Sequence, residues 1–263
     1  MPIRRNYNLK PDKFDHRDLH FMARHLKSAL PEQVDNRHYF SKIRDQGVLG
    51  SCTAFASVSG AFEMIQNKEL LNNTPINEAP EVFDNYFVQA STLFQYQNTL
   101  ILENAFGEDN GAEIRTSIKA LAKYGVCKET SWPYVLENFP VRPPTQAYAE
   151  AFKHKISIYA RATSQIAIRQ ALASCLPVVI GILIYESFES DLVAKYGHVP
   201  MPDVNNEACL GGHAVCLAGY TKEGWIVRNS WGDDWGLGGY FILPMNYINL
   251  KNGLATDAWV INK

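Results

Sequence analysis

Apolar residues recur at three- and four-residue steps in the first half of the chain. This spacing predicts a long helix from Cys52 to about Lys68, because residues so spaced share one helical face. The stretches 81–102 and 114–124 are also predicted to be helical, and Gly125 is a suitable C-cap for the second. The buried stripe of the first helix comprises Phe55, Val58, Phe62 and Ile65.

The second half is richer in strand patterns. Alternating or continuous apolar runs predict strands, separated by Gly-rich turns, at 155–160, 178–185, 213–220, 224–229 and 239–243. A helix is predicted at 164–174 and a long loop at 186–207. Four prolines between 133 and 144 mark a boundary between two lobes. The chain is therefore predicted to be α+β, with a helical lobe over 31–140 and a β-rich lobe over 141–263.

Residues 1–30 precede both lobes. Asp18 is placed to cap a short helix with Leu19, Met22 and Leu26 on one face, ending at Pro31. Two interpretations remain open for this N-terminal arm: a structural segment packed on the surface, or a short inhibitory segment lying over a cleft. The arm lacks the continuous apolar core of a signal peptide, so the compartment stays unknown. Both a secreted bacterial protein and a cytoplasmic one fit the sequence.

Composition narrows the class of partner. The net charge is −2 and 46% of the 263 residues are hydrophobic, which gives no reason to expect binding to nucleic acid or to a membrane surface. The longest apolar run, 176–185, is too short to cross a bilayer. Five cysteines are too few for a disulfide-dense scaffold. We expect a monomer that needs no cofactor.

The first candidate for chemistry is Cys52, in the string QGVLGSCTAFAS. A thiol at a helix N-terminus lies beside unpaired backbone N–H groups and the positive end of the helix dipole, which favours the thiolate. Gln46 lies just upstream, across a turn. Its amide and the N–H of Cys52 are placed to stabilise an oxyanion.

A thiolate that attacks an amide needs a base, and His213 in GGHAVCLAGY is the candidate. The run after it predicts a strand that fixes the ring. Asn229 in WIVRNSWG ends the following strand and is placed to orient the imidazole. Cys209 and Cys216 lie close to His213 in sequence, but a fourth zinc ligand of similar quality is missing nearby, so a metal site is not predicted.

These strings resemble the papain-like cysteine peptidases. The match covers Q-G-x-x-G-S-C-x-A-F-A, the segment LPEQVDNRHYFSKIRDQG that precedes it, and the strings around His213 and Asn229. Two positions depart from the family pattern: Leu49 stands where Cys is usual, removing half of a usual disulfide, and Thr53 stands where Trp is usual. Departures of this kind occur in bacterial and viral relatives.

The resemblance implies a papain-like two-lobe fold, with a helical left lobe, a β-barrel-like right lobe and the active site in the cleft between them. It implies that Trp231 shields the His–Asn hydrogen bond. It also implies that Asn110 and Gly111 pair with an extended substrate like an added strand. Gly212 is a further substrate-binding candidate, because its missing side chain permits close backbone approach. Ala112 would narrow the third subsite. Ile114 would help to form the wall of an apolar second subsite.

The implied activity is that of a cysteine-type endopeptidase with a Cys–His–Asn centre. An exopeptidase of the same fold is the nearest alternative, because residues 1–30 or the 186–207 loop can block one end of a cleft. A catalytically silent or self-capped peptide-binding protein is the alternative from another class. The presence of Gln46, Cys52, His213 and Asn229 together argues against a silent protein.

Overall fold

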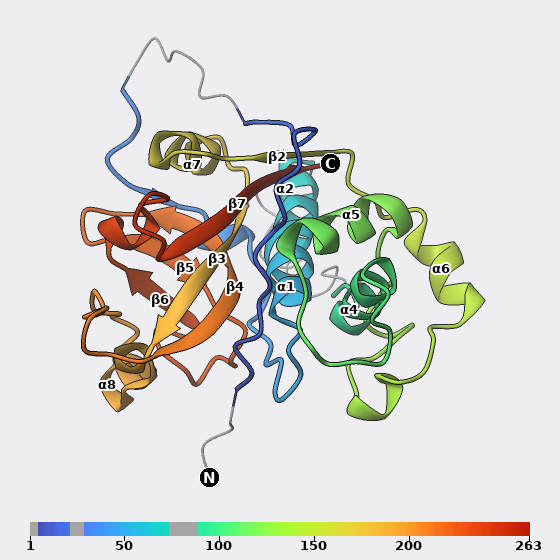
Figure 1. Cartoon of the computed structure of the whole chain (residues 1–263). Coiled ribbons are helices and arrows are strands. Elements are labelled where there is room, and N and C mark those ends of the chain that lie inside the picture. Colours follow the sequence, from blue (N-terminus) through green and yellow to red (C-terminus); the bar gives the residue numbers. More distant parts are fainter. Residues whose placement is uncertain (1–4, 22–28, 74–88) are drawn as a thin grey trace.

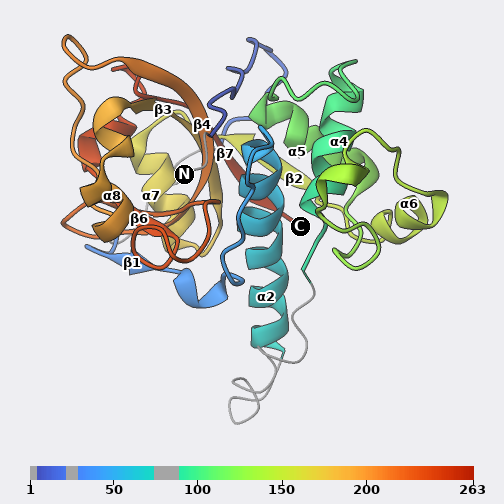
Figure 2. The ribbon, with the colours of Figure 1, turned by 90° about the horizontal axis from the view of Figure 1, so that it is seen from below.

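The computed structural model describes residues 5–21, 29–73 and 89–263. One long helical rod separates a helical side from a sheet (Figures 1 and 2). The rod consists of α1 (Cys52–Ala54), the π-helical turns η2 (Phe55–Phe62) and α2 (Glu63–Asn72). The predicted helix is confirmed. It continues four residues beyond Lys68, and its middle is wider than an α-helix.

The helical side consists of α4 (Thr92–Leu102), α5 (Ile114–Tyr124) and α6 (Thr145–Ala151). Of the helix predicted at 81–102, the described part is helical from Thr92, where the Ser91 side chain caps the N–H of Phe94. Ala90, just before the cap, pairs with Lys128 instead. Residues 81–88 of that prediction lie outside the described part of the chain.

The β-rich side is one antiparallel sheet in the order β2-β7-β3-β4-β5-β6, with β1 paired to β4. Its end strands β2 and β6 do not pair with each other in the described structure, so the sheet is not a closed barrel. The strands are β1 (Val34–Asp35), β2 (Ile158–Arg161), β3 (Val178–Tyr185), β4 (Cys209–Tyr220), β5 (Trp225–Arg228), β6 (Tyr240–Leu243) and β7 (Ala255–Asn262).

Further helices pack around the sheet. The predicted helix at 164–174 is confirmed as α7 (Gln165–Ala173), capped by Ser164. The stretch predicted as a loop at 186–207 contains the 3₁₀ turn η4 (Glu186–Glu189) and α8 (Asp191–Tyr196). Other 3₁₀ turns are η1 (Arg37–Tyr39), η3 (Leu136–Asn138) and η5 (Met245–Ile248). None of the described helices is long and apolar enough to cross a membrane.

A shared apolar core joins the rod to the sheet. Val58, Ala61 and Phe62 of the rod are buried with Cys216 and Ile226 of the sheet. The helix approaches β4 closely at Gly60, where an added Cβ would lie only 2.6 Å from the Cβ of Cys216. A residue with a side chain there would push the rod away from the sheet, and the two halves of the site would separate with it.

The N-terminal arm follows the junction of the two sides (Figure 1). Its described part, residues 5–21, is extended except for a turn at 16–17, so the helix predicted from Asp18 is wrong as far as residue 21. His20 instead forms a bridge to Arg161 at the start of the sheet. Residues 22–28, which carry the rest of that prediction, lie outside the described ranges.

Candidate active site

Cys52 is the first residue of the rod and is fully buried. The turn before it is fixed by Tyr134, whose hydroxyl hydrogen-bonds the Ser51 hydroxyl at 2.7 Å and donates to the Gln46 carbonyl at 2.8 Å. Residues on both sides of the turn are therefore held to one phenol hydroxyl, Gln46 through its carbonyl and Ser51 through its side chain. This restraint places the thiol at the helix N-terminus, as the sequence predicted.

Gln46 is buried and its amide is held at both ends. Its Nε2 donates to the Leu49 carbonyl at 2.9 Å, and its Oε1 accepts from the Ser230 hydroxyl at 2.6 Å. Nε2 carries two hydrogens. Leu49 is the one acceptor of Nε2 in the described structure, so the second hydrogen of this amide is not used by that bond.

The His213 ring is oriented as the prediction required. Its Nε2 hydrogen-bonds the Oδ1 of Asn229 at 2.9 Å, which is the contact predicted for this pair, and Nδ1 is the ring nitrogen that this bond does not use. Trp231 stacks on the imidazole with the ring centroids 4.9 Å apart. Antiparallel pairing of β4 with β5 brings His213 and Asn229 together, since Cys216 pairs with Arg228 one residue before Asn229.

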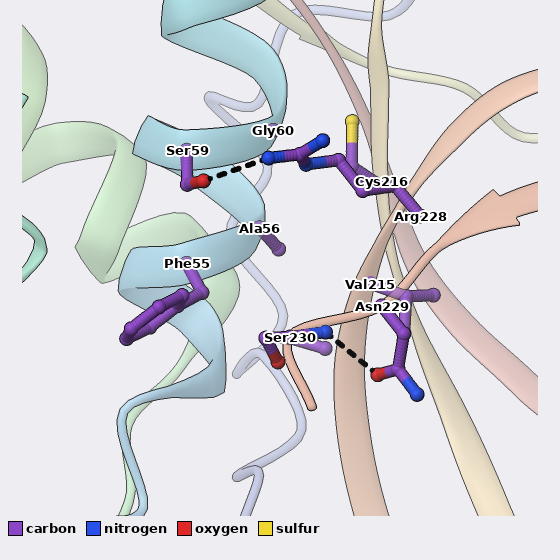
Figure 3. Close-up of a pocket in the computed structure, with 10 residues that line it drawn as sticks. Phe55, Ala56, Ser59, Gly60, Val215, Cys216, Arg228, Asn229 and Ser230 are labelled. Carbon is purple, nitrogen blue, oxygen red and sulfur yellow. Dashed lines mark hydrogen bonds between the residues drawn. The ribbon is translucent and has the colours of Figure 1, made fainter. Parts of the chain in front are cut away.

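Arg228, the last residue of β5 and the neighbour of Asn229, ties the sheet to the rod. Its buried guanidinium donates to the Ser59 hydroxyl at 3.1 Å and to the Ser41 carbonyl at 2.6 Å. Figure 3 shows this contact beside Asn229, whose Oδ1 also accepts from the Ser230 N–H at 2.9 Å. A cavity of about 10 Å³ lies between these groups. The two halves of the site are thus joined by hydrogen bonds as well as by apolar packing.

The N-terminal arm passes between the two edges that were predicted to bind substrate. Leu9 N donates to the Gly212 carbonyl and Lys10 N donates to the Ala112 carbonyl, both at 3.1 Å. The arm backbone runs so close to Gly111 that an added Cβ would lie 1.8 Å from the Asn8 carbonyl oxygen. Gly111, Ala112 and Gly212 therefore line one groove that is wide enough for a single extended chain.

The arm also covers the catalytic groups. The Tyr7 ring packs edge-on against the His213 and Trp231 rings, with centroids 6.3 and 6.0 Å away. The Arg5 guanidinium lies 4.4 Å from the Trp231 ring centroid. With the arm in place, Cys52 and His213 have exposed fractions of 0% and 1%.

This burial sets the protonation of the pair. It raises the pKa of the Cys52 thiol to about 11, because loss of solvent outweighs the backbone N–H groups of Ala214, Thr53 and Cys52 itself. It lowers the pKa of His213 to about 4, and the positive charge of Arg5 lowers it further, against the hydrogen bond from Asn229. The lowered thiol pKa expected from the helix N-terminus is therefore not found in the covered form.

Of the remaining predicted site residues, Asn110 is exposed and accepts from the Lys10 ammonium at 2.9 Å. Ile114 is buried in the cluster against which Leu9 packs. Sequence analysis missed the contributions of Ser230 and Tyr134. Ser230 stands between Asn229 and Trp231, so its place in the sequence could have indicated a role at the site. No sequence pattern around Tyr134 indicated its contact with the Cys52 turn.

Comparisons with known proteins agree with this site. A model of the family described as "Papain family cysteine protease" matches residues 30–260. An uncharacterised peptidase C1-like protein of Acanthamoeba polyphaga mimivirus is 42% identical over 230 residues, which are 83% of this chain and 69% of that protein. Cysteine proteinase 1 of Entamoeba histolytica is 28% identical over 245 residues, 89% of this chain and 70% of that protein.

Among solved structures, xylellain, a cysteine protease from Xylella fastidiosa, superposes with a TM-score of 0.82 at 34% identity, covering 98% of this chain and 96% of xylellain. Digestive procathepsin L2 from Tenebrio molitor larval midgut has a TM-score of 0.72 at 22% identity. The match covers 98% of this chain and 78% of the procathepsin, so the two proteins share the fold. The predicted α+β two-lobe fold and the resemblance to bacterial and viral members are confirmed. The chain therefore belongs to the papain family and is a cysteine peptidase.

Proposed function

We propose that this chain is an endopeptidase that cleaves within extended peptides. The observation that carries this proposal is the path of the arm. The arm enters beside Trp231 and Val48, passes His213, and leaves past Arg115, so the groove accepts a chain on both sides of the catalytic pair. An exopeptidase needs one end of its groove closed, and a continuous chain in the groove favours the endopeptidase.

The proposed reaction uses the residues already described. Cys52 Sγ attacks the scissile carbonyl while its proton resides on His213. The N–H of Cys52 and the Nε2 of Gln46 stabilise the oxyanion. His213 then protonates the leaving amine, and a water molecule, deprotonated by His213, releases the acyl group and regenerates the thiol. Asn229 orients the imidazole, and Trp231 keeps water from their hydrogen bond.

The arm also suggests what the second subsite accepts. The Leu9 side chain points toward Gly181 of β3, where an added Cβ would lie 2.7 Å from Leu9 Cδ2 and 3.1 Å from the Thr256 hydroxyl. Leu9 packs against the apolar cluster that contains Ile114. We therefore propose that substrates carry a branched aliphatic side chain at the corresponding position, P2. A peptide library showing preference for Arg or Lys at P2 would contradict this.

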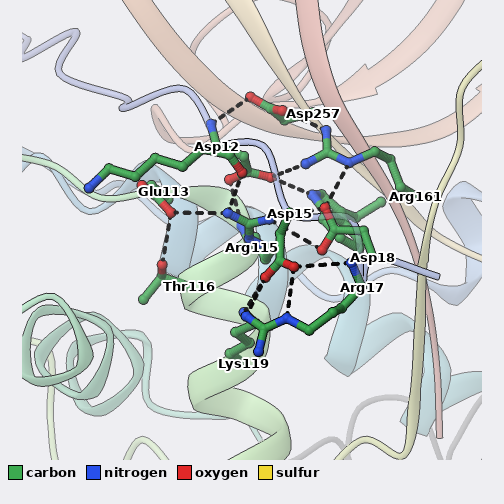
Figure 4. Close-up of polar contacts among 12 residues, drawn as sticks. Asp12, Asp15, Arg17, Asp18, Glu113, Arg115, Thr116, Lys119, Arg161 and Asp257 are labelled. Atoms are coloured by element: carbon green, nitrogen blue, oxygen red, sulfur yellow. Dashed lines mark hydrogen bonds and ion pairs between the residues drawn. The ribbon is translucent and has the colours of Figure 1, made fainter. Parts of the chain in front are cut away.

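We further propose that the arm inhibits the enzyme until it is displaced. Beyond the groove, Asp12 anchors the arm: its carboxylate, whose side chain is 0% exposed, accepts from Trp259 Nε1 at 2.7 Å, from the Arg161 guanidinium at 3.0 Å and from the Arg115 N–H at 2.9 Å (Figure 4). The Asp12 N–H donates in turn to Asp257 at 3.0 Å.

A second anchor lies six residues on. Asp18 forms an ion pair with Arg115 at 3.0 Å and with Arg161 at 3.3 Å, and Arg115 also bonds the Lys13 carbonyl. Both guanidinium groups belong to the body of the enzyme, on α5 and β2. The contacts outside the groove therefore hold the arm over it, which supports an inhibitory role for the arm.

The test compares three full-length proteins: the unchanged chain, Leu9→Asp and Cys52→Ala. Leu9→Asp places an unpaired carboxylate in an apolar site and should displace the arm. We expect the Leu9→Asp protein alone to cleave an internally quenched peptide, blocked at both ends, with Leu at P2. Faster cleavage of a dipeptide with a free amino terminus would indicate the exopeptidase.

Labelling of Cys52 by an epoxide probe distinguishes the remaining cases. Equal labelling and equal activity of the unchanged and Leu9→Asp chains would make the arm structural. Failure of every folded protein to cleave peptides or to react with the probe would support the silent peptide-binding protein.

A further inference from the structure

Asp109 connects three parts of the helical side at one carboxylate. Its Oδ1 accepts from the Gly50 N–H at 2.9 Å and from the Tyr96 hydroxyl at 2.7 Å, and its Oδ2 lies 3.2 Å from the same Gly50 nitrogen. Gly50 belongs to the turn just before Cys52. Tyr96 is fully buried in α4. Asp109 itself immediately precedes Asn110 and Gly111, which line the groove.

The usual role of an aspartate in a loop does not account for these contacts. Such an aspartate bonds N–H groups two or three residues away and stabilises its own turn. The Gly50 N–H comes from a turn 59 residues away in sequence, and Tyr96 comes from the core. The carboxylate therefore restrains one segment of the site relative to another.

The turn before Cys52 has a particular need for this restraint. All five cysteines are free, so no disulfide fixes the turn. The turn also packs tightly against the arm, because an added Cβ on Gly50 would lie 2.3 Å from Asn8 Nδ2. A hydrogen bond from a backbone N–H to a carboxylate is about twice as strong as one between neutral groups.

Electrostatics alone would not favour a carboxylate at this place. The pKa of the Cys52 thiol depends first on burial, which raises it, and next on the nearby N–H groups, which lower it. The negative charge of Asp109 has a smaller effect: it raises this pKa and so opposes the reactive thiolate. It also raises the pKa of Tyr96, which burial has already raised, so the phenol stays protonated and remains a donor. The carboxylate thus disfavours the thiolate, and its geometric restraint explains its position.

We propose that Asp109 is a positioning residue for peptide hydrolysis: it fixes the Cys52 turn relative to the Asn110–Gly111 edge, so that the thiol faces the carbonyl of a bound peptide. This inference rests on the proposed peptidase function. It predicts opposite effects on two rates. Loss of the carboxylate should make the thiol easier to ionise while making peptide turnover slower.

The experiment uses the full chain with Leu9→Asp as the parent, so that Cys52 is accessible. Asp109→Asn is introduced into the parent and compared with Glu108→Gln. Glu108 is the neighbouring exposed carboxylate, and in the described part of the chain this carboxylate accepts from the Asn110 side chain and not from Gly50. Both changes remove one negative charge from the same loop, but only Asp109 contacts Gly50.

For Asp109→Asn we expect iodoacetamide to alkylate Cys52 faster than in the parent below the thiol pKa, because removal of the negative charge lowers that pKa. We expect kcat on the quenched Leu peptide to fall about 10- to 100-fold, since misplacement by about 1 Å can slow catalysis 100-fold. Tyr96→Phe should lower kcat as well, without changing the pH profile of alkylation. Glu108→Gln should leave both rates near those of the parent.

Three results would overturn the inference. Unchanged kcat in Asp109→Asn would remove the positioning role. A rise in both rates would leave Asp109 as a charge effect only, and a fall in both would indicate general disruption of the fold. The alkylation profile remains informative even if the parent cleaves no peptide, so failure of the proposed peptidase function is a separate result.

Discussion

Asp12→Asn in the full chain removes a titrating group, so the hold of the arm in this variant should weaken relative to the unchanged chain as the pH falls. The pKa of Asp12 is raised to about 6, first by burial and then by the nearby Asp257 carboxylate, against its hydrogen bonds from Arg115, Trp259 and Arg161. In a released arm the same carboxyl returns to its ordinary value of 3.8. The docked arm therefore binds a proton that the released arm loses.

The sign and size of the effect follow from linkage. A group whose pKa is raised on docking favours docking most fully at low pH, and the benefit is lost as the pH rises through about 6. At about 1.4 kcal/mol for each pKa unit, the shift is worth about 3 kcal/mol in full. Between pH 7 and pH 5, docking should tighten by about 1.4 kcal/mol, which is roughly tenfold.

The assay is alkylation of Cys52 by iodoacetamide in the unchanged and Asp12→Asn chains between pH 5 and pH 7. The ratio of the two rates cancels the ionisation of the thiol and of His213, because both chains share those groups. We expect the ratio of Asp12→Asn to unchanged chain to rise about tenfold as the pH falls from 7 to 5.

Asp15→Asn is the matched control on the same arm. Asp15 is paired with Arg17 of the arm, and this pairing lowers the pKa of Asp15, so the carboxylate stays charged between pH 5 and pH 7. The ratio of alkylation rates of Asp15→Asn and the unchanged chain should therefore not change with pH. A ratio for Asp12→Asn that stays constant, or falls toward pH 5, would refute the reasoning. It would mean that Asp12 is held as an ordinary ion pair and that acid releases the arm.

Two further predictions concern specificity and stability. Gly181→Val should lower kcat/KM for a peptide with Leu at P2 by at least about tenfold, because the new side chain would occupy the place of Leu9. The variant should also shift the preference of a P2 library toward Gly or Ala. An unchanged library profile would exclude Gly181 as the floor of that subsite. Glu63→Ala should lower the free energy of unfolding in urea by about 3–5 kcal/mol, because buried Glu63 pairs with Arg44 and accepts from Ser41 and the Ala90 N–H. The control Glu69→Ala, at an exposed ion pair, should change the free energy of unfolding by less than about 1 kcal/mol.

Local strings were sufficient to predict which residues meet at the candidate active site, because each string contains its own structural reason. Gln46 and Cys52 share one turn, and His213 and Asn229 end up together because consecutive antiparallel strands pair. Long apolar runs likewise predicted the rod and most of the sheet. Strand β7 was missed, since Thr256 and Asp257 interrupt its apolar pattern in order to face the arm.

The anchors of the arm were beyond the reach of sequence reasoning. Asp12, Arg161 and Asp257 come from three distant segments, and each is a single charge with no periodic pattern around it. Only the folded chain shows that they meet. The same holds for Asp109, whose two partners lie on a separate turn and a separate helix. Long-range polar contacts of this kind depend on tertiary packing, which local propensity does not encode.

The thiol pKa of Cys52 depends on two effects of opposite sign, the local helix N-terminus and burial by tertiary packing. The helix N-terminus favours the thiolate, and the N–H groups of Cys52 and Thr53 do lower the pKa in the structure. Burial is the larger effect, and it leaves the thiol pKa near 11 and the imidazole pKa near 4, so the proton stays on sulfur. Part of that imbalance comes from the arm, since Arg5 acts on His213 and Tyr7 packs against its ring. The arm would therefore inhibit in two ways, by filling the groove and by keeping the catalytic pair neutral, and its departure would restore both the space and the charge that attack on a carbonyl requires.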